Sequence, residues 1–477
     1  MDDTAQPRLA ETYTEVEDAL LSRWPETRLE PSLDRIEAFM ELLGEPQRGY
    51  PAIHLTGTNG KTSTARMIEA LIQALGLRVG RFTSPHLESM TERISLDGQP
   101  LSEEAFVGAF NDVAPYTHLV DADAEHPLSF FETVVGMAYA AFADAPVDAA
   151  VVEVGMGGAW DATNVIDADV AVLTPIANDH AQYLGDSPVA IAQEKVGIIK
   201  PGATVISAVQ SEDVARVLFE RCAEVGATLM REGLEFGVTN RVPAVGGQLL
   251  GLQGLRGTYE ELFVPLYGAH QAQNAALALA AVEAFVGGEG ALDGEVVAAA
   301  FAEVTSPGRL EIIRRSPTIV LDAAHNPHGA AALAEALDDS FTFSPLIGVV
   351  GVMADKDAEG LLAELEPHLA HLVCTQNSSD RSTPAGELAE IARGVFGSDR
   401  VTETTSLADA IDQAAALAEA GEAVGDAFGA GGVLVTGSVV TVGEARALLR
   451  PRRTPGQAAA VADDTWTDSD QDPRNDD

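Results

Sequence analysis

The residues Gly57 to Thr62, with the sequence GTNGKT, have the types and spacing that could hold the phosphates of a nucleotide. The stretch from Ile53 to Leu55, which is apolar at both ends, precedes them, and a helical pattern of apolar residues follows. Such a glycine loop turns backbone N–H groups toward one point, while Lys61 adds a positive charge and the Thr62 hydroxyl suits Mg²⁺. The longer form of this motif would have a glycine at Leu55, so a glycine turn capping a helix is the alternative. The flanking strand and helix favour a nucleoside triphosphate site.

Two later apolar runs end in side chains that could complete this site. Glu153 ends one run and is followed by glycines, and His180 follows the run from Val170 to Leu173. In an open α/β sheet, ligands bind outside the carboxyl ends of the strands, so these side chains are expected to converge on Gly57 to Thr62. Glu153 would then bind Mg²⁺ directly or through water. A solvated glutamate and a capping or core histidine are the alternatives.

Three further polar residues lie in segments that could reach the same place. Ser84, in a stretch rich in Ser, Thr and Pro, offers a hydroxyl to a metal, although a turn residue is the simpler interpretation. Asn274, near the start of an alanine-rich helix, could reach a base or ribose. Lys195 lies on a helix that ends at Pro201-Gly202; an ammonium group cannot bind metal, so a surface or electrostatic role is the alternative.

Composition sets limits on the class of protein. A chain of 477 residues is longer than one hydrophobic core usually serves, and 46% hydrophobic with 21% charged residues is typical of a globular protein. An acidic start and the lack of long uninterrupted apolar stretches predict a soluble, cytoplasmic protein. The two cysteines, Cys222 and Cys374, stand apart from any Cys/His cluster, which argues against disulfides and a zinc site.

The formal net charge of -44 disfavours binding to nucleic acid or to an anionic membrane. Adaptation to the host is a sufficient explanation of this acidity. An anionic ligand must then be held by local positive charge or by metal ions. The positions of the few lysines are therefore informative; they are Lys61, Lys195, Lys200 and Lys356.

The order of the patterns predicts an α/β protein with two domains. Residues 1–305 are expected to form a P-loop mononucleotide-binding domain, in which residues 203–265 have a mixed α/β pattern with a turn at Gly246-Gly247. Alternating strands and helices in residues 306–450 predict a smaller, doubly wound, Rossmann-like domain. The acidic, aperiodic residues 451–477 are expected to be disordered.

Several motifs, in this order, resemble folylpolyglutamate synthase, a family close to dihydrofolate synthase among the Mur-type ATP-dependent amide ligases. The resemblance covers nearly everything from about residue 15 to 448. The motifs are GTNGKTS (57–63), TSPHL (83–87), VEVGMGGAWDATN (152–164), NDHAQYLG (178–185), EKVGIIK (194–200), PGRLE (307–311), DAAHNP (322–327) and DKD (355–357). The resemblance implies a first domain like the Mur central domain and a second like the Mur C-terminal domain, on the glutamate side.

The resemblance also implies a reaction. ATP would phosphorylate a carboxylate of a reduced folate or of dihydropteroate, and the amine of L-glutamate would attack the acyl phosphate to give an amide, ADP and phosphate. Such a reaction needs the charge on the transferring phosphoryl group to be neutralised.

Site residues are carried over motif by motif. The implied catalytic residues are Lys61, Glu153, His180 and Lys195. The implied ATP-binding residues are Gly57, Thr58, Asn59, Gly60, Lys61, Thr62, Asn274, Arg309, Asp322 and His325. The implied metal ligands are Thr62, Ser84 and Glu153 for one Mg²⁺, and Glu153, His180 and Lys195 for a second, with Lys195 carbamylated as is common in the family. The implied folate-binding residues are Phe130, Phe131, Glu132, Trp160, Asp161 and Ala162, with core packing as the alternative for the two phenylalanines.

Other readings stay open. Ala159 stands where the family usually has arginine, which bears on the folate form accepted, and the stretch TGSVVTVGEAR (436–446) also departs from the usual version. Folylpolyglutamate synthase is the leading hypothesis, with dihydrofolate synthase, a bifunctional enzyme and a peptidoglycan-precursor ligase behind it. Two alternatives come from other classes of protein. A P-loop nucleotide switch would need a guanine-reading segment, which this sequence lacks. An inactive binding module would be expected to have lost one of the catalytic residues. A monomer is expected.

Overall fold

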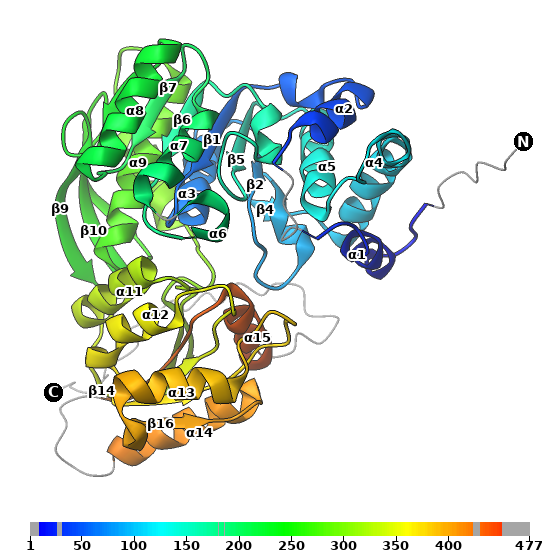
Figure 1. Cartoon of the computed structure of the whole chain (residues 1–477). Helices are drawn as coiled ribbons and strands as arrows, with labels where there is room; N and C mark the ends of the chain where they lie inside the picture. The colour runs from blue at the N-terminus through cyan, green and yellow to red at the C-terminus, as the bar shows by residue number, and fades with distance from the viewer. Residues whose placement is uncertain (1–8, 26–30, 180, 186, 423–429, 451–477) are drawn as a thin grey trace, which may run out of the picture.

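The computed structural model describes residues 9–25, 31–179, 181–185, 187–422 and 430–450. The predicted tail, residues 451–477, and His180 lie outside the described residues. Elements up to α10 build an eight-stranded and a three-stranded sheet, and elements from β12 onward build a six-stranded sheet (Figure 1). The α/β class predicted from the sequence is confirmed.

The eight-stranded sheet has the order β4-β3-β2-β5-β1-β6-β7-β8. Its central strand β1 pairs in parallel with β5 on one side and β6 on the other, while β3 and β4 form an antiparallel edge. The strands are β1 (Ala52–Thr56), β2 (Val79–Phe82), β3 (Ile94–Leu96), β4 (Gln99–Pro100), β5 (Ala149–Glu153), β6 (Val170–Leu173), β7 (Thr204–Ser207) and β8 (Thr228–Arg231). This order brings the carboxyl ends of β5, β1 and β6 side by side.

Both faces of this sheet are covered, as the wholly buried β1 requires. Ile53 and Leu55 point into the core made with α3, α9 and α10, whereas Ala52 points into the core made with α1, α2, α4 and α5. A third core, beside α7 and α8, covers β6 and β7. The helices are α1 (Tyr13–Leu21), α2 (Asp34–Leu42), α3 (Lys61–Ala74), α4 (Glu103–Asp123), α5 (Phe130–Asp144), α6 (Ala181–Leu184), α7 (Pro188–Lys195), α8 (Glu212–Val225), α9 (Ala269–Val286) and α10 (Gly294–Ala302).

Residues 237–264 form a separate antiparallel sheet rather than more of the mixed α/β pattern predicted for 203–265. It comprises β9 (Gly237–Ala244), β10 (Gly247–Gln253) and β11 (Thr258–Val264), and it packs on α9. The turn that joins β9 to β10 is formed by Val245 and Gly246, one residue before the predicted Gly246-Gly247, and Gly246 has a positive φ of 84° that favours glycine.

The six-stranded sheet has the order β12-β13-β17-β14-β15-β16, antiparallel only at the β12–β13 pair. Helices α11, α12 and α13 cover one face, and α14 and α15 cover the other, which confirms the doubly wound arrangement. The strands are β12 (Glu311–Arg315), β13 (Thr318–Leu321), β14 (Phe343–Val350), β15 (His371–Cys374), β16 (Val401–Glu403) and β17 (Ala430–Thr436). The helices are α11 (Pro327–Ser340), α12 (Ala358–Leu365), α13 (Ala385–Phe396), α14 (Leu407–Glu422) and α15 (Val439–Leu449).

A domain division between residues 305 and 306 stays a prediction. The described connection from the end of α10 to the start of β12, which contains no helix or strand, supports it. Among the described helices, none combines the length and the apolar composition that crossing a membrane requires.

A buried ion pair lies under the first sheet. The Arg81 guanidinium, which is 0% exposed, donates from Nε to Glu69 (2.6 Å) and from Nη1 to the Thr83 hydroxyl (2.8 Å). Ser95 donates to the other Glu69 oxygen (2.8 Å). This network ties α3, which begins in the predicted phosphate loop (residues 57–62), to β2 and β3.

We expect Arg81→Met to lower the free energy of unfolding by about 3–5 kcal/mol, because it leaves the Glu69 carboxylate buried without its counter-charge. Urea denaturation measures the loss. Arg78→Met is the control, since Arg78 lies just before the same strand and its pair with Asp97 is about half exposed and is worth roughly 0–1 kcal/mol. Equal losses of unfolding free energy in the two variants would contradict the stabilising role of the buried Arg81–Glu69 pair.

Candidate active site

The phosphate loop takes its shape from two glycines. Gly60 caps the start of α3 in the left-handed conformation, with φ 89°, and a side chain there would meet Asn274. At Gly57, with φ 145°, an added Cβ would lie 1.9 Å from the Thr174 hydroxyl oxygen. Thr58 then bonds the segment after β6, because its hydroxyl donates to the carbonyl oxygen of Ala177 (2.9 Å). The loop is therefore fixed against β6, and α3 points its N-terminus at the loop.

A cavity of about 630 Å³ opens at this edge of the sheet, between the first and second domains. Residues predicted from separate motifs meet in its wall. They are Gly57, Thr58, Asn59, Gly60, Lys61, Thr62, Ser84, Glu153, Lys195, Asn274, Arg309, Asp322 and His325. The ATP-binding residues implied by the resemblance thus come together in space, as do its described metal ligands.

Lys61 holds its charge over the loop. Its Nζ donates to the carbonyl oxygens of Gly57 (3.1 Å) and Thr58 (3.2 Å). Burial lowers the pKa of Lys61, while the carboxylates of Glu153 and Asp179 oppose that shift. A phosphate in the cavity would meet an ammonium group that is poorly solvated and therefore interacts strongly with it.

Glu153, Thr62 and Ser84 form a set of oxygen donors. The Thr62 hydroxyl lies 3.0 Å from both carboxylate oxygens of Glu153, which is 1% exposed. Burial raises the pKa of Glu153, opposed by Lys61 and by hydrogen bonds from Thr62 and the Ser84 backbone. One carboxylate with hydroxyls beside a phosphate site fits Mg²⁺, which keeps several waters and binds few protein ligands. Within the described residues, His, Cys, Asp and Glu do not gather in threes in a way that could hold a metal.

Lys195 ends α7 with its side chain buried against the same cavity, at 4% exposure. Burial lowers the pKa of Lys195 to about 7, with a further lowering from Lys61 and opposition from Asp161 and Asp179. A substantial share of this amine is therefore uncharged at neutral pH. That is the form that can react with CO₂, so the site fits the carbamate implied by the resemblance.

The second domain supplies the far wall of the cavity. The carboxylate of Asp322 accepts backbone hydrogen bonds from Leu310 (2.9 Å) and Ala324 (2.9 Å), so it is held rigidly at the end of β13. Burial raises the pKa of Asp322, and the neighbouring Arg309 opposes the shift most. Across the cavity, Asn274 on α9 donates to Gln271 (3.1 Å).

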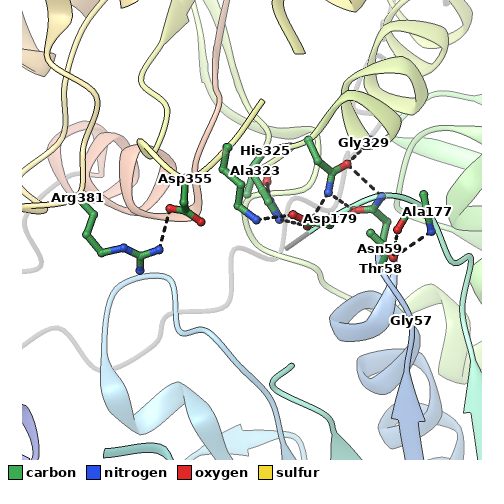
Figure 2. Close-up of polar contacts among 12 residues, drawn as sticks. Gly57, Thr58, Asn59, Ala177, Asp179, Ala323, His325, Gly329, Asp355 and Arg381 are labelled. Atoms are coloured by element: carbon green, nitrogen blue, oxygen red, sulfur yellow. Dashed lines mark hydrogen bonds and ion pairs between the residues drawn. The ribbon is translucent and has the colours of Figure 1, made fainter. Parts of the chain in front are cut away.

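A polar network joins the two domains beside Asn59 of the phosphate loop (Figure 2). Asp179, after β6, accepts from Lys356 (2.6 Å) and Asn326 (3.0 Å) and lies 3.5 Å from Nε2 of His325. Asn59 of the loop exchanges hydrogen bonds with Asn326 (3.2 and 3.3 Å). Lys356 belongs to the DKD motif, but no role for it or for Asp179 was predicted from the sequence. Two signals could have found them. Asp179 follows a predicted strand and is next to His180, and Lys356 is one of only four lysines in an acidic chain.

Family models match both domains. One described as the Mur ligase middle domain matches residues 113–282, and one described as the Mur ligase glutamate ligase domain matches residues 308–438. A dihydrofolate synthase/folylpolyglutamate synthase of Mycobacterium tuberculosis is 51% identical over 454 residues, which cover 91% of this chain and 93% of the relative. The chain belongs to the folylpolyglutamate synthase/dihydrofolate synthase family. The family predicted from the motifs and the predicted class of enzyme, an ATP-dependent glutamate ligase, are confirmed.

Solved structures of this ligase family have the same fold. A structure described as M. tuberculosis folylpolyglutamate synthase complexed with ADP matches with a TM-score of 0.88 and 51% identity, covering 92% of this chain and 98% of that one. A structure described as E. coli FolC in complex with DHPP and ADP matches with a TM-score of 0.80 and 31% identity, covering 93% and 99%. The likeness extends over both domains.

The folate-binding residues implied by the family resemblance lie behind the cavity rather than in its wall. Of the described residues that line the cavity, none belongs to segments 130–132 or 160–162. Phe131 and Trp160 pack against Gly155 and Gly157, which do line it.

The remaining members of those segments have local roles in the structure. Phe130 is buried under the Arg93 guanidinium, 4.8 Å from the ring centre. Glu132 closes the capping box of α5 with Ser129 and pairs with Arg35 (3.1 Å). Asp161 caps the turn that begins at Ala162 and accepts from the Met156 backbone (2.8 Å). Their part in binding folate stays a prediction.

Proposed function

We propose that this ligase joins L-glutamate both to dihydropteroate and to reduced folates, and is thus bifunctional. The observation that carries the proposal is the 51% identity, along 93% of its length, to a relative named for both activities. The E. coli complex with DHPP, a ligand of dihydropteroate type, adds support from a second relative. Folylpolyglutamate synthase alone led the sequence analysis; the relatives favour the bifunctional alternative raised there.

We propose that Lys61 and the backbone N–H groups of Gly57–Thr62 hold the triphosphate. Two structures of relatives with bound ADP support a nucleotide in this cavity. Arg309, Asp322 and His325 would contact the same nucleotide from the second domain, and Asn274 from α9. Lys61 neutralises charge on the phosphoryl group as it passes to the folate carboxylate.

For Mg²⁺, the proposed ligands are Thr62, Ser84 and Glu153 at one position. At a second position they are Glu153, His180 and a carbamylated Lys195. Bound there, the metal would supply positive charge to the phosphate oxygens. A carbamate would turn the Lys195 amine into an anionic oxygen ligand and would give a role to a lysine buried near the carboxylates of Asp161 and Asp179.

We propose that the folate lies against the first domain and glutamate against the second, with the acyl phosphate between them. The glutamate nitrogen attacks the acyl carbon, the bond from that carbon to the phosphate oxygen breaks, and phosphate leaves. Residues of both domains enclose the reacting atoms, and this enclosure limits hydrolysis of the acyl phosphate. The enzyme is proposed to work in the cytoplasm as a monomer; light scattering tests the latter.

Phosphate release from ATP tests the proposal, with Mg²⁺ and L-glutamate present and the acceptor varied. Bifunctionality predicts stimulation by dihydropteroate and by a reduced folate monoglutamate, each against a no-acceptor control. Stimulation by only one of them would make the enzyme monofunctional. No stimulation of phosphate release by either acceptor would favour another Mur-type substrate or a nucleotide switch.

A further inference from the structure

The connection from β2 to β3, residues 83–93, links the phosphate site to the second domain; we call it the Ser84 loop. At its base, the Thr83 N–H donates to the carbonyl oxygen of Arg93 (3.0 Å). Ser84 lines the cavity, and its backbone N–H is a hydrogen-bond donor to Glu153. Its tip, Leu87 and Glu88, lies only three to four residues away. In Figure 1 this blue connection reaches down toward the red helix α15.

The Ser84 loop is braced internally. The Glu92 carboxylate accepts backbone hydrogen bonds from Leu87 (2.8 Å), Glu88 (3.0 Å) and Ser89 (3.0 Å). Arg93 donates to His86 (2.9 Å) across the loop. These bonds make base and tip one rigid unit, so a displacement of the tip is transmitted to Ser84.

The tip is inserted into the second domain. Leu87 packs against the core on the α15 face of the six-stranded sheet. At Gly443 on α15, an added Cβ would lie 2.0 Å from the carbonyl oxygen of Leu87, so only glycine permits this approach. At Gly308, an added Cβ would lie 3.3 Å from the Leu87 side chain. Backbone from α15 and from the chain before β12 therefore encloses the tip.

One buried arginine closes this contact. Arg446 on α15 is 5% exposed, and its Nη1 lies 2.9 Å from a Glu88 carboxylate oxygen. Its Nε lies 2.8 Å from Glu311 of β12, which in turn accepts from the Gly308 N–H (2.8 Å). The same guanidinium thus holds the loop tip and the segment that joins the two domains.

We propose that the second domain sets the position of Ser84 at the nucleotide site by holding the loop tip, with Glu88 and Arg446 as positioning residues. The inference rests on the proposed role of Ser84 as a ligand of Mg²⁺. It also gives a function to the stretch 436–446, whose departure from the family pattern had no interpretation. Gly443 makes room for the Leu87 backbone, and Arg446 binds the Glu88 side chain.

Glu88→Gln tests the proposal, because it removes the charge on the loop side and leaves the Arg446–Glu311 pair in place. We would measure the affinity of a non-hydrolysable ATP analogue by calorimetry, once with Mg²⁺ and once with EDTA. The variant is expected to bind about tenfold more weakly with Mg²⁺ and as tightly as the unmodified enzyme in EDTA. Leu87→Ala, which removes the inserted side chain, should give the same pattern.

Arg241→Gln is the matched control. Arg241 on β9 forms an ion pair with Asp339 on α11, so it also joins the two domains, but at the left of Figure 1, away from α15. Its affinity for the analogue should be unchanged in both conditions.

The possible outcomes distinguish a failure of this inference from a failure of the proposed metal site. Unchanged affinity of Glu88→Gln with Mg²⁺ would overturn the inference, as would an equal loss in EDTA or in Arg241→Gln. If the unmodified enzyme bound the analogue equally with Mg²⁺ and with EDTA, the proposed metal site itself would fail.

Discussion

Replacing Lys61 by alanine is expected to slow phosphate release from ATP by about a thousandfold or more, without unfolding the protein. The Lys61 ammonium lies over the loop carbonyls, close to the buried Glu153. Without it, the triphosphate would face the Glu153 carboxylate in a poorly solvated cavity and would lose the positive charge that the loop itself supplies. Coupled-assay rates with both acceptors measure the loss, and circular dichroism checks the fold.

Lys200→Ala is the control for Lys61, since lysines are few and this one has a structural role. Its Nζ donates to the Asn164 carbonyl oxygen (2.8 Å) and lies 3.9 Å from Asp167. We expect nearly full activity from this variant. Near-normal turnover by Lys61→Ala would refute the phosphate assignment.

Replacing Lys195 by alanine is expected to cost roughly a hundredfold to a thousandfold in rate and to be partly rescued by short carboxylates. The substitution leaves a space at the end of α7, in the wall of the cavity that Glu153 also lines, where acetate or propionate could stand in for the carbamate. Phosphate release measured against carboxylate concentration, in CO₂-depleted buffer, gives the rescue curve.

Lys61→Ala serves as the rescue control, because a carboxylate cannot replace its positive charge. Full activity of Lys195→Ala without additives would remove Lys195 from the metal site. A loss that no carboxylate restores would indicate that the amine itself, not its carbamate, is the working group.

Much of the site could be predicted because its residues follow directly from local patterns. Glu153 is the last residue of a buried strand, and the glycine loop follows another. Because these strands are parallel, their carboxyl ends lie at the same edge of the sheet. For Glu153 and the glycine loop, the period of the apolar residues and the identity of the next polar residue were enough. Asp322 also follows a strand, but its role was implied only by the family resemblance.

Contacts between distant segments could not be predicted in this way. Asp179 and Lys356 are 177 positions apart, and no periodicity relates them. The antiparallel sheet of β9 to β11 was missed because β9 alternates weakly and bulges interrupt the pairing of β10 with both of its neighbours. Glu132, which the resemblance assigns to folate, also has a local role that its neighbours indicate, because it completes the capping box of α5 with Ser129.

The hydrogen bonds between Asn59 and Asn326 have a consequence for turnover. Asn59 belongs to the loop proposed to hold the phosphates, and its partner belongs to the other domain. We expect spent nucleotide to leave past this set of short polar contacts, which includes Asp179 and Lys356. Release of ADP would then require the contacts to part, so the catalytic cycle would be paced by an opening motion and would slow in viscous solvent.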